Sequence, residues 1–156
     1  MRIVFIGAVK FSERVLSHLI QLDADVVGVC TLESSKFNSD HYDLTELSKK
    51  HNIPVKYTLN INSEKNILWI KSLNPDIIFC FGWSQLLKQE LLNLTPLGVI
   101  GFHPAALPAN RGRHPLIWAI ILGLGETAST FFFMDDGADN GEILSQRKMR
   151  ISKDDN

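Results

Sequence analysis

The sequence has few of the features that mark metal-binding, disulfide-bonded or membrane-spanning proteins. Cys30 and Cys80 are its only cysteines, and each lies in an apolar segment without a CxxC or Cys/His spacing. Such cysteines are typical of core thiols in a reducing compartment. The first apolar run is too short to cross a bilayer and is not followed by a cleavage site. We therefore predict a cytoplasmic protein without a metal and without a membrane partner.

Motifs for phosphate binding and covalent catalysis are also missing. The first turn, "GAVKFS", has one glycine where a dinucleotide site has GxGxxG, and GxxxxGK[ST] does not occur. No serine lies in a nucleophile elbow. The formal net charge of -1 over 156 residues does not indicate a general nucleic-acid or membrane-surface binder. These absences disfavour a dinucleotide enzyme, a P-loop NTPase and a serine hydrolase.

Short apolar runs alternate with amphipathic stretches, without a linker or an internal repeat. The predicted strands are 2–7, 25–31, 53–57, 76–81, 98–102, 127–134 and 142–150. The predicted helices are 11–22, 43–51, 63–73 with Ser63 as N-cap, 86–94 and 115–122. This alternation predicts an α/β fold, a Rossmann-like and mostly parallel sheet with helices on both faces. The last two strands follow each other directly, which predicts an antiparallel addition at the C-terminal end.

Three segments at or after predicted strand ends carry residues suited to chemistry. His103 ends a strand and precedes the loop "PAALPANRGRHP", while "MDDGADNGEIL" and "CFGWSQLL" follow other strands. Ligands of parallel sheets bind beyond the carboxyl ends of the strands, which favours a functional interpretation of His103. Each segment also has a structural interpretation, because hydrogen-bonded histidines, Asp/Gly turns and packed aromatic pairs are common.

Together the three segments resemble the folate-dependent formyltransferase family, which includes methionyl-tRNA, glycinamide ribonucleotide and nucleotide-sugar formyltransferases. The resemblance covers nearly the whole chain and is most specific in the second half, "GVI.FHPA.LP..RG..P...AI..G..ET..T...MD.G.D.G.IL". It implies the formyltransferase fold over residues 1–156, as a single N-terminal catalytic domain that we expect to be truncated at its C-terminus.

The resemblance implies transfer of a formyl group from 10-formyltetrahydrofolate to a primary amine, with His103 and Asp139 as catalytic residues. An amine that attacks a formyl carbon generates an oxyanion and an ammonium. A histidine can donate to the first or relay a proton from the second, and a carboxylate can orient the ring. The activated formyl donor makes a metal unnecessary.

Gly101 departs from the family pattern, which has a catalytic Asn at that position. Glycine lacks a side-chain donor, and loss of an oxyanion donor costs about 100- to 1,000-fold in rate. Replacement by a water or by the Asn110 side chain, a slow enzyme, and a domain that has lost the reaction are three interpretations left open. We expect Gly101→Asn to fold normally and to preserve or raise activity.

The resemblance further implies a folate site and an acceptor site. The predicted folate-binding residues are Phe81, Gly82, Trp83, Ser84, Leu86, Asp135, Asp136, Gly137, Ala138 and Gly141, with the loop 135–141 closing over the pteridine. The predicted acceptor-binding residues are Pro104, Asn110, Arg111, Gly112 and Arg113.

The acceptor loop predicts the class of amine. "LPANRGRHPLIWAI" is similar to loops of sugar formyltransferases, and guanidinium groups pair well with phosphate. The favoured acceptor is therefore the amino group of a nucleotide-linked aminosugar. The alternatives are methionyl-tRNA, a non-catalytic folate-binding module, and a hydrolase that releases formate from the same cofactor.

Overall fold

The computed structural model describes residues 1–36, 38–137, 139–152 and 154–155. The chain forms two compact units, Met1–Val99 and Ile100–Asn156. The first unit contains the predicted parallel strands, and the second contains His103 and the predicted antiparallel addition.

The first unit alternates strands and helices, as predicted. Its strands are β1 (Arg2–Ile6), β2 (Asp25–Thr31), β3 (Val55–Tyr57) and β4 (Ile77–Cys80). Its helices are α1 (Lys10–Gln21), α2 (Thr45–Lys50), α3 (Glu64–Ser72) and α4 (Gln89–Leu92). β1 pairs in parallel with β2 and β4, and β2 pairs in parallel with β3. The strand order in this unit is therefore β3-β2-β1-β4.

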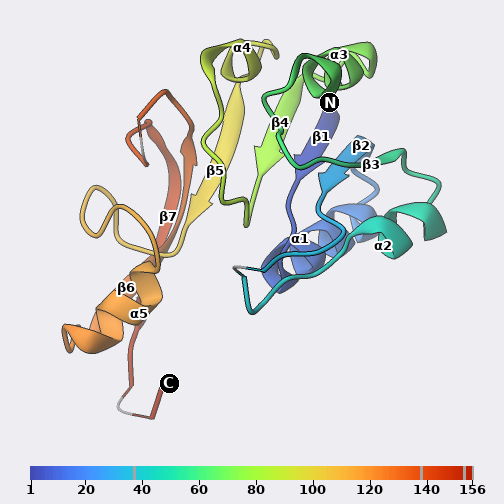
Figure 1. Ribbon diagram of the computed structural model, residues 1–156. Helices are drawn as coiled ribbons and strands as arrows, with labels where there is room; N and C mark the ends of the chain where they lie inside the picture. Colours follow the sequence, from blue (N-terminus) through green and yellow to red (C-terminus); the bar gives the residue numbers. More distant parts are fainter. Residues whose placement is uncertain (37, 138, 153, 156) are drawn as a thin grey trace. The chain divides into compact units, whose positions relative to one another are not determined.

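Helices cover both faces of this parallel sheet. The chain moves outward from β1 through β2 to β3 and then returns to β4. Because crossovers between parallel strands are right-handed, α1 and α2 lie on one face and α3 lies on the other. Figure 1 shows α1 and α2 together, apart from α3. The predicted two-sided arrangement is confirmed for this unit.

Both cysteines belong to the core of the first unit. Cys30 lies on β2 and Cys80 on β4, and both are buried free thiols. Burial raises the pKa of Cys30 and of Cys80 to about 12, since a thiolate would lose its hydration there. Neither cysteine has the exposed, electropositive surroundings of a reactive thiol.

Two local predictions differ from the structure. Ser63 is the N-cap of α3, but its side chain makes no capping hydrogen bond. Its carbonyl instead accepts from the N–H groups of Asn66 and Ile67, at 2.9 and 3.0 Å. α4 is shorter than predicted because the Asn62 side chain holds the preceding turn, donating to the Leu86 carbonyl at 2.8 Å and accepting from Lys88 N–H at 2.7 Å.

The described part of the second unit contains three strands and one helix. These are β5 (Val99–His103), which begins at the last residue of the first unit, α5 (Pro115–Ile121), β6 (Glu126–Phe133) and β7 (Ile143–Arg150). β6 pairs antiparallel with both β5 and β7, which confirms the predicted addition. Side chains from this sheet fix the loop after β5. Thr130 Oγ1 donates to the Ala105 carbonyl at 2.7 Å, and Gln146 Nε2 donates to the Leu107 carbonyl at 3.0 Å.

α5 is short, apolar and largely exposed. Proline begins it, and Ala119 is its only buried residue. The side chain of Trp118 is 54% exposed. Within the described residues, no helix has the length and apolar character needed to cross a membrane.

Candidate active site

His103 and Asp139 lie together in the second unit, as the resemblance implies. His103 ends β5 and is only 5% exposed. Its Nδ1 lies 3.5 Å from Asp139 Oδ2, and its Nε2 lies 2.8 Å from the Asn110 carbonyl oxygen. The imidazole therefore has an acceptor beside each ring nitrogen. Residues far apart in the sequence converge on one ring.

This geometry determines what the ring can do with its protons. A doubly protonated imidazole donates from both nitrogens, which matches a carbonyl on one side and a carboxylate on the other. A neutral ring would turn a lone pair toward one of these acceptors. The pair of acceptors thus suits a histidine that holds a proton ready for donation.

The loop after β5 supports both residues through its backbone. The Asn110 carbonyl accepts from the ring, and the Gly112 N–H donates to Asp139 Oδ2 at 3.1 Å. Gly112 has φ +100, a conformation that side-chain-bearing residues rarely adopt. Asn110 contacts His103 through its main-chain carbonyl.

Gly101 lies on the same face of β5 as His103, since alternate residues of a strand share a face. It pairs across the sheet with Phe132. A Cβ at position 101 would lie 2.9 Å from Phe132 Cζ, 2.9 Å from Met134 Cγ and 3.1 Å from Met134 Sδ. Apolar side chains therefore occupy the space of the missing Asn. Gly101→Asn therefore requires Phe132 or Met134 to shift, which adds a packing cost to the expected fold.

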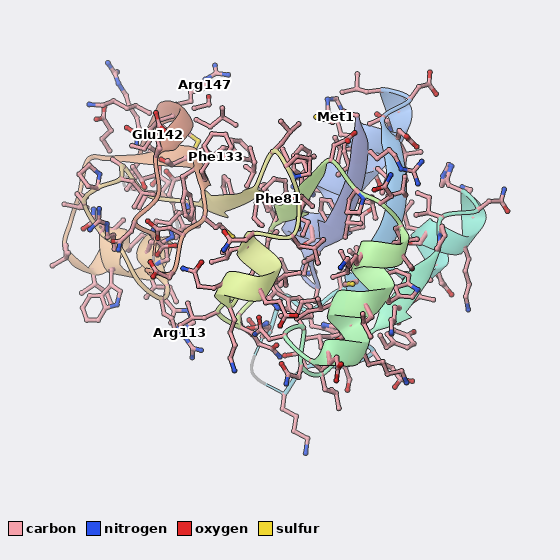
Figure 2. The ribbon with its side chains drawn as sticks, turned by 90° about the horizontal axis from the view of Figure 1, so that it is seen from above. Met1, Phe81, Arg113, Phe133, Glu142 and Arg147 are labelled. Carbon is pink, nitrogen blue, oxygen red and sulfur yellow. The ribbon has the colours of Figure 1, made fainter. Side chains whose placement is uncertain are left out.

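The loop 135–141 connects β6 to β7 and carries Asp139. Asp135 Oδ1 accepts from Gly137 N–H at 2.9 Å, which forms a tight turn at the start of the loop. Phe133 N–H donates to the Glu142 carbonyl at 2.8 Å and closes the loop at its base, and Figure 2 labels both residues. Gly141 lies against the Phe133 carbonyl, and Asp136 is exposed. The predicted folate contact Ala138 lies outside the described residues.

The other predicted folate segment follows β4 in the first unit. Phe81 N–H donates to the Ile6 carbonyl at 2.9 Å, and the Phe81 carbonyl accepts from Ser12 Oγ at 2.6 Å. The Leu86 carbonyl accepts a hydrogen bond from Asn62 Nδ2. Within the described residues, the backbone groups of Gly82, Trp83 and Ser84 make no hydrogen bond, and the buried Trp83 indole Nε1 has no partner. The backbone groups of this short turn are thus available to a hydrogen-bonding ligand, and the carbonyls of Phe81 and Leu86 each already accept one hydrogen bond.

The predicted acceptor residues divide into two groups. The Pro104 carbonyl accepts from Thr127 Oγ1 at 3.2 Å, which is a packing role. Asn110, Arg111 and Arg113 instead line a cavity with three residues that sequence reasoning did not single out, namely Pro115 and Trp118 of α5 and its C-cap Leu122. Figure 2 shows the Arg113 side chain extending away from the ribbon. Among the described residues, no group of three or more His, Cys, Asp or Glu side chains has a metal-binding arrangement.

Comparison with known proteins shows the family to which the chain belongs. The family model for "Formyl transferase" matches residues 1–156. The chain belongs to this formyl transferase family. The sequence is 34% identical over 160 residues to the methionyl-tRNA formyltransferase of Geotalea uraniireducens strain Rf4, which covers 100% of the chain and 51% of that relative. The chain therefore spans about half the length of the curated relatives that it matches.

Solved structures show the same fold. Phosphoribosylglycinamide formyltransferase from Bacillus halodurans aligns with a TM-score of 0.85 at 20% identity, covering 100% of this chain and 83% of that chain. A sugar 3N-formyl transferase crystallised with dTDP and 5-N-formyl-THF aligns with a TM-score of 0.70 at 20% identity, covering 97% and 52%. Family membership and these alignments confirm the resemblance and the predicted fold class.

Proposed function

We propose that the whole protein transfers a formyl group from 10-formyltetrahydrofolate to a primary amine. The observation that carries this proposal is the pairing of His103 Nδ1 with Asp139 Oδ2 at 3.5 Å, in a member of the formyl transferase family. The segments 82–84 and 135–141 supply the folate contacts, with loop 135–141 closing over the pteridine. The proposal requires no metal, because the formyl group on the folate nitrogen is already activated.

The amine attacks the formyl carbon and forms a new C–N bond, while the carbonyl oxygen takes up negative charge. The His103 ring gives up its hydrogen bond to the Asn110 carbonyl and donates a proton toward that oxygen instead. Asp139 holds the ring and stabilises its positive charge. The bond from carbon to the folate nitrogen then breaks, and that nitrogen receives the proton that the attacking amine loses. Gly101 supplies no side-chain donor, and Phe132 and Met134 fill the space beside it, so the oxyanion lacks this contact and the rate is lower than an Asn would permit.

Methionyl-tRNA is the acceptor that the comparisons favour. Eight curated relatives, 31% to 35% identical to the chain, all have the name methionyl-tRNA formyltransferase. The acceptor preferred from the sequence, a nucleotide-linked aminosugar, is supported by the loop "RGRHP", while the sugar enzyme at 20% identity supports the fold alone. We therefore place methionyl-tRNA first and the aminosugar second.

The test is an acceptor panel with the complete protein. The protein is incubated with 10-formyltetrahydrofolate and with charged initiator tRNA, several aminosugar nucleotides, or no amine. Mass spectrometry then reads the addition of one formyl group. We expect formylation of the methionyl amine and little formate without an acceptor.

Two other results would exclude the proposal in different ways. Equal formate release with and without amines would identify a hydrolase. Folate-dependent thermal stabilisation without any product would identify a binding module.

A further inference from the structure

A cavity of about 230 Å³ lies beside the His103 loop, within the second unit. Its lining residues come from the loop before α5 and from one face of that helix: Asn110, Arg111, Arg113, Pro115, Trp118 and Leu122. Asn110 joins this cavity to the candidate active site, because its carbonyl also accepts the hydrogen bond from His103 Nε2. A ligand in the cavity is therefore separated from the His103 ring by Asn110 alone.

The cavity is cationic and has no internal counter-charge. Arg111 and Arg113 have no carboxylate partner among the described residues, and no acidic residue lines the cavity. Lys148, by contrast, pairs with Glu126 at 2.8 Å. Two arginines that line one cavity without a protein anion suit a phosphate, because a guanidinium group binds phosphate through paired donors.

The opposite wall is aromatic and apolar. Trp118 lines the cavity from α5, and its side chain is 54% exposed. Pro115 and Leu122 lie on its face of α5, at helical spacings of three and four residues. An indole next to arginines is the combination that stacks a nucleobase while a neighbouring phosphate is neutralised.

We propose that this cavity binds one nucleotide of the formyl acceptor, with its phosphate on Arg111 and Arg113 and its base on Trp118. The inference rests on the proposed function for the identity of the acceptor. The cavity volume of about 230 Å³ is below the range of about 300–1,000 Å³ of drug-sized sites, so the cavity holds part of one nucleotide and not a longer segment. The terminal nucleotide of a charged tRNA and the nucleotide of an aminosugar share this chemistry.

Binding is measured first, because it does not depend on catalysis. The complete protein is titrated calorimetrically with adenosine 5'-monophosphate, with dTDP and with uncharged tRNA. We expect Trp118→Ala to weaken binding by about 5- to 150-fold and Trp118→Phe to restore most of it. Arg111→Ala should lower the salt dependence of tRNA binding by about one unit of slope. Ile121→Ala and Arg147→Ala, which change exposed residues outside the cavity, are the matched controls.

Kinetics then separate this inference from the proposed function. Trp118→Ala should raise KM for the acceptor by a similar factor, with kcat and KM for the folate within twofold of wild type. Stronger binding of tRNA than of dTDP identifies the terminal nucleotide of a tRNA as the ligand. Stronger binding of dTDP identifies the nucleotide of an aminosugar. The inference is overturned if none of the three probes binds, or if Ile121→Ala weakens binding as much as Trp118→Ala. A protein that binds nucleotides through Trp118 but transfers no formyl group would refute only the proposed function.

Discussion

His103 has hydrogen-bonding partners on both sides because one loop and one turn approach it from opposite directions. The Asn110 carbonyl lies at Nε2 and the Asp139 carboxylate at Nδ1. The Gly112 N–H in turn holds that carboxylate. Two backbone groups of a single loop therefore position both members of the proposed catalytic pair.

Gly112→Ala tests this positioning. Alanine at φ +100 is strained by at least about 1–2 kcal/mol, so the loop should shift and release Asp139. We expect kcat to fall by up to about 100-fold, since small displacements of catalytic groups are costly. Gly123→Ala is the matched control, because Gly123 also has positive φ and open space but lies after α5. Equal activity of the two variants, measured as single-turnover rates, would show that Gly112 does not position Asp139.

Gly101 gives a second test at the residue scale. Gly101→Ala and Gly101→Asn should each lower the free energy of unfolding by about 1–3 kcal/mol, because any Cβ meets Phe132 and Met134. Only Asn adds a donor near the reacting oxygen. We expect Gly101→Asn to transfer formyl groups faster than Gly101→Ala, below the melting temperatures of both. Identical rates would mean that the site makes no use of a donor at this position.

At the scale of elements, strands β2 and β4 carry the two buried thiols, Cys30 and Cys80. Burial raises the pKa of both cysteines to about 12, and the thiolate is the reactive form. At pH 8 the folded protein should therefore react with an aromatic disulfide reagent far more slowly than the unfolded protein does. Labelling should rise only as denaturant unfolds the first unit. Rapid labelling of either cysteine in the native protein would contradict this core assignment.

The elements themselves were largely predictable, because apolar periodicity reports which segments are buried. β2 has the predicted bounds, and α3 begins after the predicted N-cap Ser63. The late start of α4 was not predictable, since it depends on hydrogen bonds from Asn62, which lies in another segment. The exposure of Trp118 escaped prediction because an apolar helix sequence normally indicates burial.

At the scale of the whole molecule, the candidate site was only partly readable from sequence. The partnership of His103 with Asp139 came from the resemblance to a family, since spacing alone does not bring them together. The roles of Asn110 and Gly112 were hidden because main-chain groups have no sequence signature. The net charge of -1 argued against a polyanionic acceptor, but a total charge does not report local groups such as Arg111 and Arg113.

The most direct test of the account is the rate at which Asp139→Asn transfers the formyl group to its acceptor, compared with the wild-type protein. Asp154→Asn, an exposed aspartate of the same unit, is the control. We predict a loss of about 100- to 10,000-fold for Asp139→Asn, with folate binding retained and the control unchanged. A rate equal to that of the wild type would contradict the claim that His103 and Asp139 act together on the formyl group.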